Sequence, residues 1–171
     1  PGLFQHSLYR FTPRGLPPTR YGLATNAELW PMHRCKNLYL GDVMRILYLE
    51  DDPLDAEALR RALASRRPEI SLSVAATPND ALARLRQAGT EAPFDVIVVD
   101  VSLPEMNGFE FIDRLATHGR GATPRLLVFT SSEHRFDLAE AERTKVDGYV
   151  VKTADPRCFD DLVRALDVIG A

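Results

Sequence analysis

The chain has 171 residues, 45% of them hydrophobic and 26% charged, as expected for one globular domain or a smaller domain with an added segment. The net charge of −3 argues against a general nucleic-acid binder, and no apolar run reaches the roughly 18–20 residues of a membrane-spanning helix. The two cysteines, Cys35 and Cys158, are too few for a disulfide framework or a metal knuckle. We therefore expect a cytoplasmic α/β protein with two ordinary thiols.

Residues 1–43 differ in composition from the rest of the chain. They carry five cations and two anions, whereas residues 44–171 carry 16 cations and 22 anions. They also hold five of the 12 prolines and show neither helical nor strand periodicity. We expect the folded domain to begin at Met44, with 1–43 an irregular leader from cloning or an over-extended reading frame. The alternative is a basic docking arm that folds on a partner.

The first predicted elements alternate between strand and helix. Arg45–Glu50 is predicted as a strand, and Pro53–Arg66 as a helix whose apolar residues recur at helical spacing. Those apolar residues are Leu54, Ala58, Leu59, Ala62 and Leu63. Ile70–Ala75 is a weaker strand. Thr77-Pro78 then predicts a helix start, with Thr77 as N-cap and proline at the first helical position.

The same alternation continues to the end of the chain. Three further strands are predicted at Phe94–Asp100, Arg125–Thr130 and Gly148–Val151. Three further helices are expected after Asn107-Gly108, over about 133–143 and after Asp155-Pro156. The unbroken apolar run inside the Phe94–Asp100 strand indicates burial on both faces. Five strands alternating with five helices predict a parallel sheet with helices on both faces.

Polar side chains follow the ends of four predicted strands. They are Glu50-Asp51-Asp52, Asp100, Thr130-Ser131 and Lys152. Ligands of such sheets bind beyond the carboxyl ends of the strands, so these groups are expected to meet at one edge. Crowded carboxylates need a cation, and oxygen ligands without His or Cys favour a hard ion such as Mg²⁺. A carboxylate beside Mg²⁺ can attack phosphorus, with the lysine and hydroxyl binding the phosphoryl oxygens.

Each of these residues also has an ordinary structural explanation. Asp52-Pro53 fits a helix cap followed by proline at the first helical position, and we assign Asp52 to that role. Thr130 or Lys152 alone would more often be a strand-end hydroxyl or a surface cation. Asp100 differs, because it follows four aliphatic residues and no helix starts directly after it. The joint placement at successive strand ends therefore carries the functional prediction.

At this point residues 44–171 resemble the receiver domain of two-component response regulators along their whole length. The matching stretches are Ile46–Pro53, Val96–Gly108, Val128–Ser131 and Gly148–Lys152. Acid pair, aspartate, hydroxyl and lysine appear in the family's order and with similar spacing. The resemblance implies a flavodoxin-like (βα)5 fold, with a doubly wound five-stranded parallel sheet in the order 2-1-3-4-5.

The resemblance also implies a phosphorylation site. Asp100 would accept a phosphoryl group from a partner's phosphohistidine. Glu50 and Asp51 would hold Mg²⁺, helped by Asp100 itself and by the backbone carbonyl of Ser102. Lys152 would pair with the phosphoryl group.

The family's switch residues have counterparts too. Thr130 resembles the hydroxyl that turns toward the phosphoryl group, and Tyr149 the aromatic ring that moves with it. Gly108 fits the turn after the phosphorylation loop, where a residue without Cβ is convenient. One departure is Thr153, which follows the lysine where the family usually has a proline, often in a cis peptide. A non-proline cis bond costs roughly 2.5–4 kcal/mol, so the departure bears on the lysine geometry and the following loop.

The resemblance predicts a signalling phosphoacceptor and not an enzyme beyond its own phosphotransfer and autodephosphorylation. Its partners would be a sensor histidine kinase or a histidine phosphotransfer protein and a downstream protein target, with no direct nucleic-acid binding or membrane insertion, and a homodimer is compatible. We expect a stand-alone receiver. The alternatives are an unphosphorylated protein-binding module and a fragment of a larger regulator or hybrid kinase. A haloacid-dehalogenase-type phosphatase is disfavoured because Ser102 stands where a general acid is needed.

Overall fold

The computed structural model describes residues 43–87, 94–118 and 124–170. The predicted leader, apart from its last residue, therefore lies outside the described residues. Five strands are present in the described part: β1 (Arg45–Leu49), β2 (Ser71–Ala75), β3 (Val96–Val99), β4 (Arg125–Thr130) and β5 (Gly148–Val151). They alternate with five helices: α1 (Pro53–Arg66), α2 (Pro78–Gln87), α3 (Gly108–His118), α4 (Arg135–Thr144) and α5 (Cys158–Gly170).

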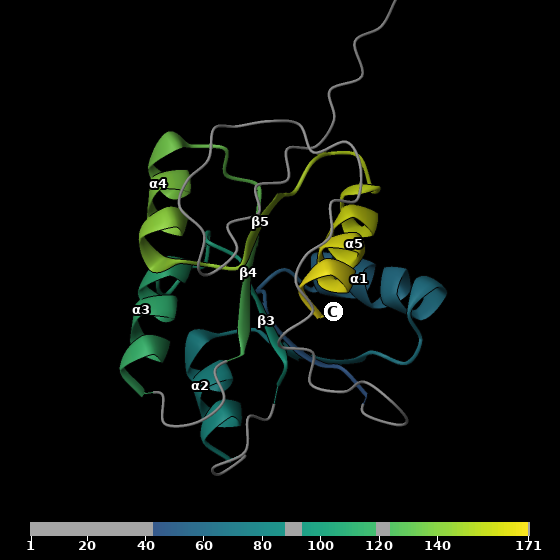
Figure 1. The fold of residues 1–171 in the computed structure, drawn as a ribbon, viewed down its shortest axis with the longest axis horizontal. Helices are drawn as coiled ribbons and strands as arrows, with labels where there is room; N and C mark the ends of the chain where they lie inside the picture. The colour runs from purple at the N-terminus through teal and green to yellow at the C-terminus, as the bar shows by residue number, and fades with distance from the viewer. Residues whose placement is uncertain (1–42, 88–93, 119–123, 171) are drawn as a thin grey trace, which may run out of the picture.

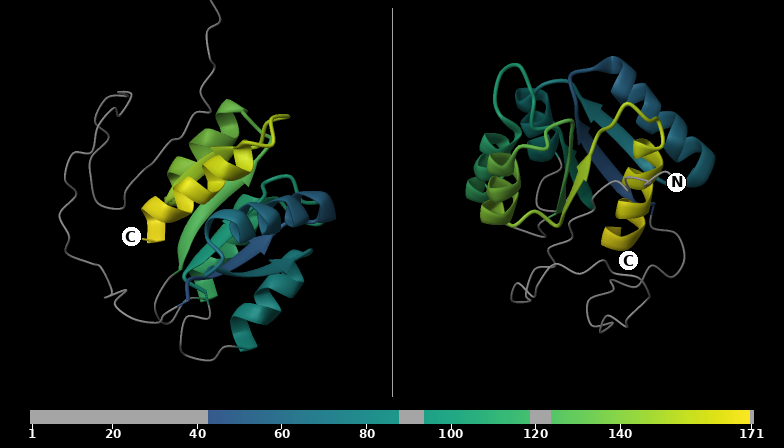
Figure 2. Two further views of the ribbon diagram at one scale, coloured as in Figure 1. Left: turned by 90° about the vertical axis from the view of Figure 1, so that its right-hand side faces the viewer. Right: turned by 90° about the horizontal axis from the view of Figure 1, so that it is seen from above.

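The strands form one parallel sheet in the order β2-β1-β3-β4-β5. Helices α1 and α5 lie on one face, and α2, α3 and α4 lie on the other (Figure 1 and Figure 2). This arrangement confirms the predicted fold class, a doubly wound (βα)5 sheet with its ends at β2 and β5. No helix in the described part of the chain is long and apolar enough to cross a membrane.

The core consists of two layers because successive side chains of a strand point to opposite faces. In β1, Ile46 and Tyr48 pack with α1 and α5, while Leu47 and Leu49 pack in the layer that includes α2 and α3 residues. Strand β3 is buried along its whole length, as its aliphatic run predicts for a central parallel strand. Both faces of the sheet are therefore covered, and the strand ends are left to carry polar groups.

Two helix starts follow the predicted capping chemistry. The carboxylate of Asp52 accepts a hydrogen bond from the backbone N–H of Leu54 at 2.7 Å, which makes Asp52 the N-cap of α1. The hydroxyl of Thr77 accepts one from the N–H of Asp80 at 3.1 Å at the start of α2. These caps were predictable because they depend on residues close together in sequence.

Two local predictions were wrong. Leu54, expected on the buried stripe of α1, is 77% exposed, because the helix packs instead through Ala56, Leu59 and Leu63, a set spaced by three and four residues. Helix α5, expected directly after Asp155-Pro156, begins at Cys158. The Asp155 carboxylate accepts from the N–H of Arg157, which makes a turn before the helix.

Candidate functional site

The sheet register brings the polar residues together at the carboxyl edge of the strands. Leu49 pairs with Val99, so the next residues, Glu50 and Asp100, follow neighbouring strands. The N–H of Asp100 donates to the carbonyl of Leu49 at 3.1 Å. On the other side, the N–H of Lys152 donates to the carbonyl of Thr130 at 2.8 Å. These backbone hydrogen bonds extend the pairing by one residue beyond the strands. They therefore fix the backbone positions of Asp100 and Lys152.

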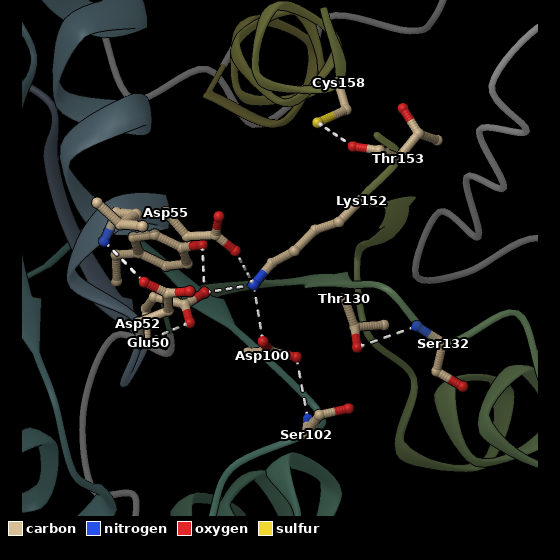
Figure 3. Close-up of polar contacts among 12 residues, drawn as sticks. Glu50, Asp52, Asp55, Asp100, Ser102, Thr130, Ser132, Lys152, Thr153 and Cys158 are labelled. Carbon is tan, nitrogen blue, oxygen red and sulfur yellow. Dashed lines mark hydrogen bonds and ion pairs between the residues drawn. The ribbon is translucent and has the colours of Figure 1, made fainter. Parts of the chain in front are cut away.

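Lys152 reaches across this edge into a group of carboxylates (Figure 3). Its Nζ lies 2.7 Å from Oδ2 of Asp100 and 2.9 Å from Oδ2 of Asp55, and it also contacts Oε2 of Glu50. The side chains of Lys152, Glu50 and Asp100 are 11%, 1% and 8% exposed. The ammonium also lies 5.4 Å from the centre of the Phe129 ring. One cation is thus shared by three carboxylates in a mostly buried setting.

Besides the ammonium of Lys152, two hydrogen-bond donors hold the carboxylate of Glu50. The hydroxyl of Tyr48 donates to its Oε2 at 2.6 Å, and the N–H of Asp52 donates to Oε1 at 3.1 Å. Burial raises the pKa of Glu50 above its ordinary value, against the lowering effects of Lys152, Tyr48 and that N–H. Burial and the neighbouring Glu50 charge raise the pKa of Tyr48, which keeps its hydroxyl protonated as a donor.

Lys152 stays charged in this environment. Burial alone lowers the pKa of an ammonium, but the charges and hydrogen bonds of Asp100 and Glu50 raise the pKa of Lys152 above its ordinary value. Asp100 completes its own contacts by accepting a hydrogen bond on Oδ1 from the N–H of Ser102 at 3.0 Å. Asp100 therefore has one oxygen on a backbone donor and the other on a cation.

The loop after Asp100 passes close to the first residue of α3. A Cβ atom built on Gly108 would lie 2.2 Å from the backbone oxygen of Asp100 and 2.9 Å from Cα of Val101. The N–H of Gly108 donates to the carbonyl of Val101 at 3.1 Å. Glycine is therefore required by the close approach of two backbone segments, which is a stricter reason than the convenient turn expected from sequence.

Thr130 and Tyr149, the two residues that resemble the family's switch residues, are linked through Ser132. Thr130 is fully buried, and its hydroxyl lies 3.4 Å from the N–H of Ser132, which donates to it. The hydroxyl of Tyr149 donates to the carbonyl of Ser132 at 2.7 Å, and the ring is buried. The hydroxyl of Ser132 also bonds to the carboxylate of Asp137 in α4. Thr130, Tyr149 and α4 therefore share Ser132 as a common contact.

The lysine keeps its reach although Thr153 replaces the usual proline. No peptide bond in the described part of the chain is cis, so the bond between Lys152 and Thr153 is trans. The carbonyl of Thr153 lies 3.7 Å from the thiol of the buried Cys158 at the start of α5. A trans peptide at this position is therefore compatible with contact between Lys152 and Asp100.

The carboxylates at this edge offer oxygen ligands of the kind that a hard divalent cation prefers. In the described residues, however, no three His, Cys, Asp or Glu side chains are arranged as a ready metal site. Glu50 and Asp100 face the ammonium of Lys152, and Asp51 is exposed beside them. The donor chemistry fits a cation such as Mg²⁺, and the ammonium of Lys152 competes with such a cation for Glu50 and Asp100.

Sequence analysis overlooked two residues of this cluster. Tyr48 stands two positions before Glu50, and side chains two apart on an extended strand share a face, so its contact with Glu50 had a usable signal. Asp55 lies in the first turn of α1, where an acidic residue is ordinary helix chemistry. Its contact with Lys152 joins residues far apart in the sequence, which no local pattern reveals.

With this geometry in place, comparison with known proteins decides the family. The model of the response regulator receiver domain matches residues 46–165. The chain belongs to the response regulator receiver family. It is 30% identical over 126 residues to the nitrate/nitrite response regulator protein NarL of Escherichia coli (strain K12), covering 74% of this chain and 54% of NarL. This receiver chain therefore spans about half the length of that curated relative.

Solved structures agree on the fold. The receiver is similar to the chemotaxis protein CheY4 of Vibrio cholerae, with a TM-score of 0.63 and 23% identity over 75% of this chain and 99% of that one. It is also similar to the Mn(2+)-bound form of the response regulator Rcp1, with a TM-score of 0.63 and 20% identity over 72% of this chain and 91% of that one. These likenesses confirm the flavodoxin-like sheet order.

Proposed function

We propose that this receiver is a phosphoacceptor, in which Asp100 takes a phosphoryl group from a histidine kinase or a phosphotransfer protein in a Mg²⁺-dependent reaction. The observation that carries the proposal is the contact between the Lys152 ammonium and Asp100, beside the buried Glu50. Asp100 is a buried carboxylate at the end of a central strand and is paired with a cation. Such a carboxylate is suited to nucleophilic attack on phosphorus.

The proposed step is a simple displacement. One carboxylate oxygen of Asp100 forms a bond to phosphorus while the bond between phosphorus and the imidazole nitrogen of the donor histidine breaks. The ammonium of Lys152, which contacts Asp100, would turn to donate hydrogen bonds to the phosphoryl oxygens as the product forms. Mg²⁺ bound by Glu50, Asp51, Asp100 and the Ser102 carbonyl would neutralise the crowded carboxylates. A divalent ion is also present in the Mn(2+)-bound form of the response regulator Rcp1.

The output is proposed to be protein contact. Thr130 would turn toward the phosphoryl group, and its link through Ser132 to Tyr149 and α4 gives that motion a path to the surface. The face formed by α4, β5 and α5 would then change shape. Phe136, in the first turn of α4, is 85% exposed, and an exposed aromatic ring is a common anchor for a partner.

Phosphodonor labelling followed by intact-protein mass spectrometry tests the proposal. We expect the chain, incubated with Mg²⁺ and acetyl phosphate, to gain one phosphoryl group, and we expect Asp100→Asn to gain none. Chelation of divalent ions should abolish labelling of the wild type. A wild type that stays unlabelled under conditions that label other receivers would contradict the proposal and favour a protein-binding module without phosphorylation.

A further inference from the structure

Asp55 is the third carboxylate on Lys152 and lies outside the phosphorylation site proposed above. It belongs to the first turn of α1, and its Oδ2 is 2.9 Å from Nζ of Lys152. Figure 3 shows the ammonium between Asp55 and Asp100, which come from α1 and from the end of β3. Lys152 therefore has one partner that is neither a proposed cation ligand nor the proposed phosphoacceptor.

The three carboxylates differ in what they can do when a divalent cation binds. Glu50 and Asp100 are almost fully buried and belong to the proposed cation ligands, whereas the side chain of Asp55 is 32% exposed. If Glu50 and Asp100 turn toward a cation, the ammonium loses those contacts and is repelled by the new charge. Asp55 can keep the ammonium without giving up a ligand.

We propose that Asp55 is a positioning residue that anchors Lys152 on the α1 side of the cluster and so frees Glu50 and Asp100 for Mg²⁺. The inference rests on the proposed function, because it assumes that these carboxylates bind the cation. It assigns Asp55 a role that acts through Lys152, distinct from the general attraction of any nearby negative charge. Removal of Asp55 should therefore weaken Mg²⁺ binding, and the loss should depend on Lys152.

Calorimetric titration of the full chain with Mg²⁺ tests this role. Asp55→Asn should weaken Mg²⁺ binding by roughly two- to fivefold, the size of one close charge interaction near the surface. Asp52→Asn is the matched control, because it removes a neighbouring charge while asparagine still caps α1. We expect the control to weaken binding less than about twofold at physiological salt, where distant charges are screened. Asp55→Glu, which keeps the carboxylate, should restore most of the affinity.

The decisive comparison repeats both substitutions in a Lys152→Gln background. There the effect of Asp55→Asn should shrink to that of Asp52→Asn. Equal effects of the two substitutions when Lys152 is present, or a full Asp55→Asn effect without the lysine, would overturn the inference and leave the proposed function standing. A folded wild type without measurable Mg²⁺ binding would overturn the Mg²⁺-dependent function and this inference together.

Discussion

Two buried aspartates have similar partners and different surroundings, and they lie at opposite ends of the strands. Asp147, just before β5, accepts from the N–H of Leu126 at 2.8 Å and pairs with Arg125 at 3.0 Å. Asp100, just after β3, accepts from the N–H of Ser102 at 3.0 Å and pairs with Lys152 at 2.7 Å. Each therefore has a backbone donor and a cation beside it, and burial alone does not separate them.

The charge balance separates them. Arg125 is half-exposed beside Asp147, whereas the nearly buried Lys152 is shared by Asp100, Glu50 and Asp55. The first pair is an ordinary structural ion pair. The second cluster holds an excess of negative charge that folding alone does not explain, and such excess is typical of sites that bind a cation or perform chemistry. The contrast between a balanced and an unbalanced carboxylate is what distinguishes structure from function here.

Matched amide substitutions should give the largest contrast. Asp147→Asn is expected to lower the free energy of unfolding by about 1–3 kcal/mol, since the ion pair with Arg125 and the charge-assisted hydrogen bond from Leu126 are lost, and to leave phosphodonor labelling intact. Asp100→Asn removes one of three crowded charges, so it should leave stability unchanged or higher while abolishing labelling. Urea unfolding and intact mass check both. A large stability loss for Asp100→Asn alone would make Asp100 the structural residue.

The pH dependence of Glu50 should give a smaller effect. Its pKa is raised above 4.5 in the folded protein by burial, so the folded state holds that proton to higher pH than the unfolded chain. The contribution of Glu50 to stability is therefore greatest below its unfolded pKa and falls as pH rises through the folded one. We expect Glu50→Gln to gain stability relative to wild type as pH rises from about 4.5.

Denaturant unfolding at a series of pH values, without divalent ions, measures this difference. Glu69→Gln is a suitable control because Arg67 lowers the pKa of that exposed carboxyl, so the sign is opposite. The wild-type protein should then gain relative to the control variant as pH rises through the unfolded pKa. A stability difference between Glu50→Gln and wild type that does not change with pH would contradict the raised pKa of Glu50 in the carboxylate cluster.

The smallest effect on stability is expected at Tyr149, whose uncharged hydroxyl lies at the same edge of the sheet. Tyr149→Phe removes one hydrogen bond to the carbonyl of Ser132 and should cost about 0.5–1.5 kcal/mol of stability. Labelling of Asp100 should persist, because the tyrosine hydroxyl does not contact the carboxylate cluster. Thermal unfolding and the labelling rate check the two parts. Loss of labelling in Tyr149→Phe would contradict the separation of the Tyr149 hydrogen bond from the carboxylate cluster around Asp100.

The sequence predicted what depends on pattern and on neighbours in the chain. The sheet, the caps at Asp52 and Thr77, and the gathering of Glu50, Asp100 and Lys152 at one edge follow from periodicity and from the geometry of parallel strands. The proposed roles of these three residues, and those of Asp51, Thr130, Tyr149 and the Ser102 carbonyl, remain predictions.

What depends on packing between elements was not predictable in the same way. Asp55 meets Lys152 through a contact between distant parts of the chain, and Leu54 is exposed because helix rotation is set by the whole contact face. Helix α5 also begins later than the sequence predicts, because the Asp155 carboxylate forms a local turn with the N–H of Arg157 before the helix. Tyr48 is an intermediate case, because strand alternation alone places it beside Glu50.

The central claim, that Asp100 is the phosphorylated residue, has a direct chemical test. Borohydride reduces an aspartyl phosphate to homoserine, with release of phosphate, and leaves free carboxylates unchanged. Peptide mass spectrometry of the labelled, reduced chain should find homoserine in place of Asp100 and an unaltered Asp147. Homoserine at another aspartate, or a labelled chain whose Asp100 peptide is unchanged, would contradict the account.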